Sequence, residues 1–187
     1  KSEFEIKRMR EAIQISAEAH ELVRESIASK KNERQVQGIL EGFFLEKGAR
    51  GPAYNSIVAS GDNACILHYT SNNSPLNKGD LLLVDAGCSL TDYYNGDITR
   101  TIPIGGKFSD EQKVIYEIVL NAQKTAIQSA IIGSNSSTVH NVALTILIEG
   151  LKEIGLLSGS TEEIIENQSY KHLYMHRTGH WLGLDVH

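Results

Sequence analysis

The sequence has few of the features that mark a secreted, membrane-bound or nucleic-acid-binding protein. Only two cysteines occur, and Cys65 and Cys88 lack metal-ligand or redox spacing, so we expect two buried free thiols. Aromatic residues make up 6% of the chain and no basic block occurs, which argues against a nucleic-acid surface. No apolar run is long enough to cross a bilayer, and the first residues alternate in charge instead of forming an apolar signal core. These absences favour a cytoplasmic protein that binds neither nucleic acid nor membrane.

The chain does contain enough apolar sequence for a substantial core. Its 187 residues suit one domain of ordinary size, and 41% of them are hydrophobic. The balance of 18 basic against 23 acidic side chains gives a net charge of −5, which favours small neutral or cationic substrates.

Helix signals occur in two pairs. The first pair is predicted from the capping box at Ser2 to about Ile27, and from the cap at Asn32 to just before Gly48. The second pair is predicted from the capping box at Ser109 to about residue 131, and from 136 or 137 to about 154. Short strands are expected at 55–59, 66–69, 81–84 and 101–104, a short helix at 161–165, and an extended segment at 170–187.

The order of helix, helix and strands therefore occurs twice, which indicates a weak internal duplication, with coincidence as the alternative. The two halves would be about 1–106 and 107–187 of a single domain. A counterpart of the hairpin at 80–104 would fall after His187, so we expect the sequence to end inside its second repeat.

Two aspartates stand at the ends of that predicted hairpin. The apolar run 81–84 follows a turn and is predicted to be a buried strand, with Asp85 at its inner end. If the hairpin is centred on Thr91, Asp85 and Asp97 face each other directly. Two like charges at that distance share a proton or share cations, and hard divalent ions prefer such ligands. The plainer alternative is that Asp85 starts a turn and Asp97 caps one.

A second cluster of candidate ligands is the stretch 176–187, which contains His176, His180 and His187. His176 and His180 have the i, i+4 spacing of a zinc-binding helix, but two glycines disfavour a helix there and the intervening glutamate is missing. We therefore predict strand, loop and strand, with a bend near Gly183 that brings in His187. A single histidine is more often structural than a ligand, whereas three at this spacing, with two facing aspartates, indicate a site.

The combined motifs resemble the catalytic domain of the aminopeptidase P and prolidase family. They are Asp85-Ala86-Gly87-Cys88, Gly96-Asp97-Ile98-Thr99-Arg100-Thr101, the His-x3-His-x2-Gly-x3-His pattern from His176 to His187, and Ile66-Leu67-His68-Tyr69, which is similar to the family's upstream active-site histidine segment. The resemblance implies an α+β pita-bread fold, in which helix pairs related by a pseudo-twofold axis cover a curved antiparallel sheet. It accounts for the repeated order of elements.

The resemblance also implies a dinuclear metal site. Asp85 would bind one of two divalent ions, for which manganese is usual, Asp97 would bridge both, and His180 would hold the first through its imidazole. The cleft would be lined by His68, His176 and His187, with His187 donating to the scissile carbonyl or to the oxyanion that develops from it. The implied activity releases the N-terminal residue from a peptide that has proline in second place, and we expect the intact protein to be a homo-oligomer.

The sequence departs from the family pattern in two ways. Asp97 follows Asp85 by twelve positions, one more than is usual, and we expect the extra residue to enlarge the turn at 89–94 or to form a bulge. Two further glutamate ligands, one of them the general base, would lie beyond His187, and we expect the customary N-terminal domain to be absent. We therefore expect these residues alone to bind metal poorly and to lack peptidase activity.

Three functions compete. An Xaa-Pro aminopeptidase is favoured over its sibling prolidase by His68-Tyr69 and by the block 176–187. A methionine aminopeptidase shares the metal residues, but segments 98–100 and 181–184 look less like it. A metal-free peptide-binding or histone-binding module of the same fold is disfavoured by the retained Asp85, Asp97 and His180.

Overall fold

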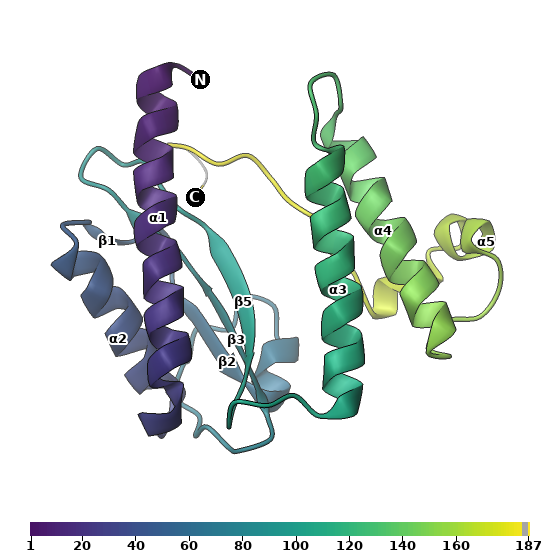
Figure 1. The fold of residues 1–187 in the computed structure, drawn as a ribbon, viewed down its shortest axis with the longest axis horizontal. Coiled ribbons are helices and arrows are strands. Elements are labelled where there is room, and N and C mark those ends of the chain that lie inside the picture. Colours follow the sequence, from purple (N-terminus) through teal and green to yellow (C-terminus); the bar gives the residue numbers. More distant parts are fainter. Residues whose placement is uncertain (185–186) are drawn as a thin grey trace. The chain divides into compact units, whose positions relative to one another are not determined.

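The computed structural model describes residues 1–184 and 187, and the chain runs from helices through strands to further helices (Figure 1). It divides into two compact units. The first unit comprises Lys1–Phe108 and Trp181–His187, and the second comprises Ser109–His180.

The first unit begins with two helices, α1 (Glu3–Ser26) and α2 (Glu33–Glu46), separated by the short 3-10 helix η1 (Ile27–Ser29). The capping box is formed, because Glu5 N–H donates to Ser2 Oγ and Ser2 N–H donates to the Glu5 carboxylate. Asn32 caps α2, and Gly48 follows that helix with a φ of 82°. Both predicted helices are confirmed.

The strands form two antiparallel sheets. Strands β2 (Ile57–Ser60), β3 (Leu81–Ala86) and β5 (Ile98–Pro103) lie in the order β2-β3-β5, and β1 (Gly51–Pro52) pairs with β4 (Cys88–Ser89). The strand predicted at 66–69 is wrong: the 3-10 helix η2 (Gly61–Cys65) ends just before it, and His68 has a φ of 54°, which no strand residue adopts.

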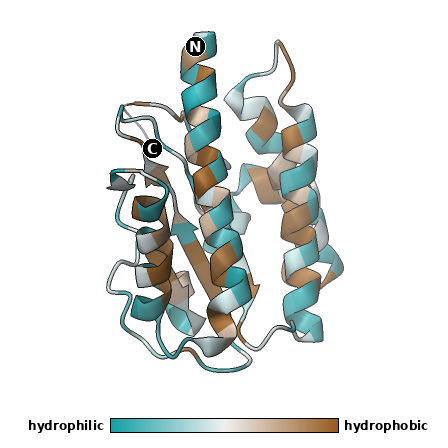
Figure 2. Cartoon of the chain, turned by 60° about the vertical axis from the view of Figure 1, so that its left-hand side comes forward, coloured by the Kyte–Doolittle hydropathy of each residue, from teal (hydrophilic) through white to brown (hydrophobic). Residues whose placement is uncertain are grey.

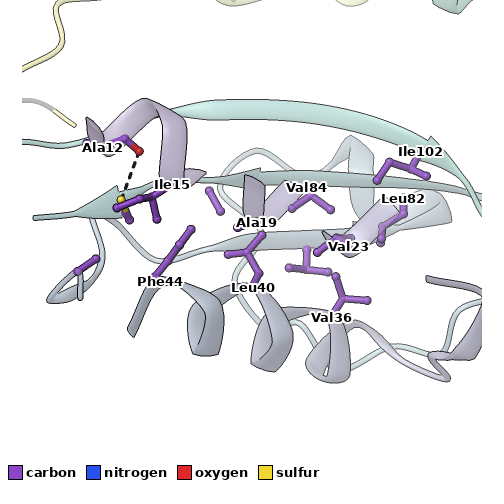
Figure 3. Close-up of a cluster of buried hydrophobic side chains, with 14 of the residues drawn as sticks. Ala12, Ile15, Ala19, Val23, Val36, Leu40, Phe44, Leu82, Val84 and Ile102 are labelled. Atoms are coloured by element: carbon purple, nitrogen blue, oxygen red, sulfur yellow. Dashed lines mark hydrogen bonds between the residues drawn. The ribbon is translucent and has the colours of Figure 1, made fainter. Parts of the chain in front are cut away.

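The core of this unit lies between α1, α2 and one face of the three-stranded sheet (Figure 3). Apolar and polar residues alternate around both helices, as Figure 2 shows, and the apolar sides supply the core. Phe44 of α2 is fully buried, so its truncation to alanine would cost about 3–5 kcal/mol. The main buried members are Ala12, Ile15, Ala19, Val23, Val36, Leu40, Phe44, Leu82, Val84 and Ile102.

Strand β3 is buried on one face only, which corrects the prediction of a strand buried throughout. Leu82, Val84 and Ala86 are fully buried, whereas Leu83 and Asp85, which alternate with them, are half-buried. Because successive side chains of a strand point to opposite faces, Asp85 lies on the face away from the core. That face is where a polar site can form.

The second unit is helical in its described residues, with α3 (Asp110–Ser129), α4 (Ser136–Glu153), α5 (Thr161–Glu166) and the 3-10 helix η3 (Ser169–His172). The predicted helices are confirmed, and a small core joins α4, α5 and the turn between them through Leu144, Ile148, Leu157 and Ile164. The prediction of an extended segment at 170–187 is wrong: η3 opens it, and no strand follows in 173–184. Residues 185 and 186 lie outside the described part.

Cys88 is buried, as predicted, but Cys65 is exposed, which corrects the second half of that prediction. Cys65 is the last residue of η2, a short helix in which none of the residues is buried. Among the helices in the described part of the chain, none is both long and apolar enough to span a bilayer.

Candidate metal centre

Asp85 and Asp97 are not directly opposite each other, so the predicted register is wrong, and the residue opposite Asp85 lies two positions further along the chain than expected. Asp85 pairs with Thr99 across β3 and β5. The same register continues past the strands, because Gly96 N–H donates to the Cys88 carbonyl at 2.9 Å and Ser89 is bridged to Asn95. The turn is thus centred on Asp92 and accommodates the extra residue without a bulge between Ala86 and Ile98. Of the two possibilities for the twelve-residue spacing, the unbroken register excludes the bulge.

This register still places the two carboxylates on one face. By its continuation Asp97 stands opposite Gly87, so Asp85 and Asp97 are diagonal neighbours with the same side-chain parity. Gly87 permits the close approach, since a Cβ there would lie 1.8 Å from the Gly96 carbonyl oxygen. Gly96 in turn packs against α1, where a Cβ would lie 2.5 Å from Ser16 Oγ. Two glycines therefore set the hairpin that carries Asp97.

The hydroxyl of Tyr54 joins the two aspartates. It lies 2.6 Å from Asp85 Oδ1 and 2.7 Å from Asp97 Oδ1. Burial, followed by the hydrogen bonds to both carboxylates and their negative charge, raises the pKa of Tyr54 far above its ordinary value, so the group remains a donor. The sequence interpretation missed Tyr54, because a lone tyrosine before a strand has no distinctive spacing or charge.

The arrangement fits a divalent cation. A tyrosine hydroxyl has one proton, so Tyr54 donates to Asp85 or to Asp97 but not to both at once. At the carboxylate that does not receive this proton, a lone pair of the Tyr54 oxygen faces a lone pair of the carboxylate oxygen. Both carboxylates are half-buried and negatively charged, so this contact is stable only with a proton or a cation nearby. Carboxylate oxygens are the ligands that hard divalent ions prefer.

His187 lies beside Asp97, with ligand atoms of the two residues within 4.8 Å of each other, close enough to serve one metal centre. Its ring also packs on the ring of Tyr54, with centroids 4.2 Å apart and planes tilted by 39°. The structure therefore brings together Asp85, Asp97 and His187 of the predicted site and adds Tyr54.

His20 supports the end of β3 from the core side. It is 5% exposed, and its Nε2 donates to the Ala86 carbonyl at 3.0 Å, one residue after Asp85. Burial lowers the pKa of His20 and outweighs the opposing hydrogen bond to Ala86, so the ring is neutral near pH 7. A buried neutral histidine thus fixes the backbone that carries Asp85.

His68 is exposed on the turn after η2, and within the described residues it does not belong to the group of possible metal ligands that contains Asp97. Its positive φ turns the chain between two exposed apolar residues and Tyr69. The prediction that His68 lines a cleft with the metal ligands remains a prediction.

His176 and His180 belong to the second unit and are exposed. The Arg177 carbonyl accepts from His176 Nδ1 at 2.9 Å, and the His176 ring meets Tyr174 edge-on at 4.9 Å. The predicted strand setting of these histidines is wrong, since they lie in irregular chain. Their assignment as a cleft residue and a metal ligand stays a prediction.

Comparison with known proteins finds relatives along the whole chain. The pattern of metallopeptidase family M24 matches residues 7–187. An Xaa-Pro aminopeptidase of Haemophilus influenzae is 47% identical over 187 residues, which is 100% of this chain and 43% of that protein. Escherichia coli aminopeptidase P with the inhibitor Pro-Leu matches with a TM-score of 0.96 and 42% identity, covering 100% of this chain and 42% of that one. The zinc-substituted Escherichia coli enzyme in complex with product gives a TM-score of 0.92 and 41% identity at the same coverage.

The chain spans less than half the length of these relatives. At this similarity the predicted α+β pita-bread fold is confirmed. Divalent metal ions are the cofactors that the family and the zinc-substituted relative indicate. On its sequence, its fold and its paired carboxylates, the chain belongs to metallopeptidase family M24.

Proposed function

We propose that this chain is the metal-binding part of an Xaa-Pro aminopeptidase, a dinuclear metalloenzyme that releases the N-terminal residue of a peptide with proline in second place. The observation that carries the proposal is the pair Asp85 and Asp97, which share the Tyr54 hydroxyl at 2.6 and 2.7 Å. The 47% identical relative is an Xaa-Pro aminopeptidase, which supports the substrate class.

Three residues of this chain would hold two divalent ions. Asp85 would bind one ion, Asp97 would bridge both, and His180 would hold the first through its imidazole. Manganese is the ion we propose, because oxygen-rich ligation suits it. When bound, such a pair would supply a Lewis acid and would lower the pKa of the attacking water.

The remaining side chains would bind and orient the peptide. His68, His176 and His187 would line the cleft, and His187 would donate a hydrogen bond to the scissile carbonyl or the oxyanion that develops from it. The stacking of His187 on Tyr54 restricts rotation of the imidazole, which keeps its donor directed. Tyr54 would hold the two carboxylates at the separation that the ions require.

The test uses the full-length protein, stripped of metal with a chelator and reloaded with Mn²⁺ or Zn²⁺. Hydrolysis is measured on an Xaa-Pro-Yaa tripeptide, an Xaa-Pro dipeptide and a methionyl peptide without proline. We expect turnover of the tripeptide, and only after metal is returned. Turnover of the dipeptide alone would identify a prolidase, turnover of the methionyl peptide a methionine aminopeptidase, and binding without turnover in either metal a peptide-binding module.

The homo-oligomeric state and the cytoplasmic location expected from the sequence remain predictions. Light scattering on the same full-length sample measures the first, and a mass equal to one chain would contradict it.

A further inference from the structure

Glu33, the first residue of α2, is a carboxylate with 0% of its surface exposed. A buried carboxylate is costly unless donors replace the water it has lost. Glu33 lies on the core side of α2, and that helix is held in the core by Val36, Leu40 and Phe44. The carboxylate is thus fixed to a rigid element.

Both oxygens of Glu33 accept hydrogen bonds. Oε1 accepts from Ser60 N–H at 2.8 Å and from Asn63 Nδ2 at 3.0 Å, and Oε2 accepts from the Tyr69 hydroxyl at 2.8 Å and from Ser74 N–H at 2.9 Å. Burial raises the pKa of Glu33, but the hydrogen bonds from Asn63, Ser60, Ser74 and Tyr69 together outweigh it and leave the pKa below its ordinary value. Glu33 is therefore ionised at neutral pH.

All of these donors belong to one stretch of chain, residues 60–74, which we call the 60–74 segment. It leaves the end of β2, passes through η2 and returns to α2 at Ser74, whose carbonyl accepts from Glu33 N–H at 3.0 Å. Asn72 is a second anchor, because its Oδ1 accepts from Val58 N–H at 3.0 Å and its Nδ2 donates to the Ser56 carbonyl at 2.7 Å. Glu33 therefore fastens the segment at its start, middle and end.

His68 lies at the bend of this segment, between two of the residues that Glu33 binds. It lies between Asn63 and Tyr69, both of which are bound by Glu33, and it follows Ile66 and Leu67, which are 55% and 63% exposed. Its φ of 54° is a costly backbone conformation for a residue other than glycine, and persists only where the neighbouring structure imposes it. Within the described residues no hydrogen bond to the His68 ring is formed, so its position depends on the backbone around it.

We infer that Glu33 is a positioning residue, which sets the place of the His68 imidazole by holding Tyr69 and Asn63 on either side of it. The inference rests on the proposed function, in which His68 lines the substrate cleft. It adds a fully buried residue on α2, which would act through the 60–74 segment. Tyr69 is the direct link, because its hydroxyl is bound to Glu33 and its backbone adjoins His68.

The test is a double-mutant cycle in the full-length, metal-loaded protein. Tyr69→Phe removes the link to Glu33 and keeps the ring, and we expect it to lower kcat/KM for an Xaa-Pro peptide about tenfold, since small misplacements of a positioned group cost up to ~10²-fold. In a His68→Ala background the same change should cost less than about twofold, because effects that pass through one residue are not additive. Tyr93→Phe, which removes a hydroxyl from an exposed ring, is the matched control and should be neutral.

Glu33→Gln extends the test to the carboxylate, since its amide would direct N–H groups at donors. Hydrogen exchange, followed by mass spectrometry of peptides from the 60–74 segment, should speed up in Glu33→Gln and Tyr69→Phe. Glu46→Gln, which removes an equal charge from an exposed position of α2, should leave it unchanged. Exchange in β3 should remain at the wild-type rate in all three variants.

The inference is overturned if Tyr69→Phe leaves kcat/KM within about twofold of wild type, or lowers it equally with and without His68. A wild-type protein that does not hydrolyse Xaa-Pro peptides would refute the proposed function instead. The exchange data then still decide whether Glu33 holds the segment, and unchanged exchange in Glu33→Gln would show that it does not.

Discussion

Tyr54→Phe is the substitution that most specifically probes the candidate metal centre, because it removes one oxygen and leaves the ring. That oxygen lies 2.6 Å from Asp85 and 2.7 Å from Asp97. Loss of an outer-shell donor to metal-binding carboxylates costs about 10–100-fold in metal affinity, which corresponds to about 1.4–2.7 kcal/mol.

An opposite effect must be weighed against this loss. The metal-free protein also loses a donor to two carboxylates, and leaving buried acceptors unpaired costs about 1–3 kcal/mol, which would favour metal binding in the variant. Asp85 and Asp97 are only half-buried, so water can replace much of the lost hydrogen bonding, and the cost of the unpaired acceptors lies at the low end of that range. We therefore expect the loss of orientation to dominate and metal affinity to fall.

The assay is calorimetric titration of Mn²⁺ into the metal-stripped full-length protein, with Tyr93→Phe as the matched control. Tyr93 is 57% exposed and stacks on Arg50, a contact that phenylalanine retains. Metal affinity in Tyr54→Phe equal to that of wild type, or tighter, would refute the assignment of the hydroxyl as an organiser of the two carboxylates.

Two further predictions concern the backbone around this site. Gly87→Ala would bring a Cβ to 1.8 Å from the Gly96 carbonyl oxygen and should lower the free energy of unfolding, measured in urea, by more than about 4 kcal/mol. Gly42→Ala, in an open position of α2, is the control and should be neutral or slightly stabilising. Equal stability of the two variants would contradict the close packing of Gly87 against Gly96. Burial lowers the pKa of His20, so the unfolded chain binds a proton at this histidine more tightly than the folded protein does. The contribution of neutral His20 to the free energy of unfolding is therefore complete above about pH 6.5 and is lost as pH falls below that value. His20→Gln should flatten the pH dependence of the melting temperature between about pH 6.5 and 5, and an unchanged slope, equal to that of the exposed-site control His172→Gln, would contradict it.

Local signals in the sequence were sufficient for the helices. Capping at Ser2, Asn32 and Ser109 is decided within one turn of helix, and each cap is formed as predicted. The helical face of α2 follows from residue spacing alone.

The register of the hairpin could not be obtained in the same way. Whether Asp85 pairs with Asp97 or with Thr99 depends on the turn, and the turn depends on how closely Gly87 packs against Gly96 and Gly96 against α1. The contact of Gly96 with α1 joins parts of the chain about eighty residues apart, which no local pattern records. The parity of the two aspartates was nevertheless predicted correctly, because both registers keep them on one face.

The roles of side chains that belong to no charge or spacing pattern could also not be predicted from the sequence. Tyr54 becomes part of the site only because β2 and β3 pair so that Ile57 lies next to Asp85. The strand predicted at 66–69 failed for a similar reason: Glu33, far away in sequence, binds Tyr69 and holds the segment in a turn. Long-range hydrogen bonds overrode a local strand preference.

The most direct test of the two-metal assignment is the activity of Asp97→Ala in the full-length protein, measured as kcat/KM for an Xaa-Pro peptide together with the metal content of the purified sample. Asp97 is the proposed bridge between the two ions, so its removal should lower kcat/KM by at least about a thousandfold, since metal-assisted steps supply several kcal/mol. Asp92→Ala, on the turn of the same hairpin and paired with Arg8, is the matched control and should keep most of the activity. Turnover of Asp97→Ala at the wild-type rate, with two ions still bound per chain, would contradict the account.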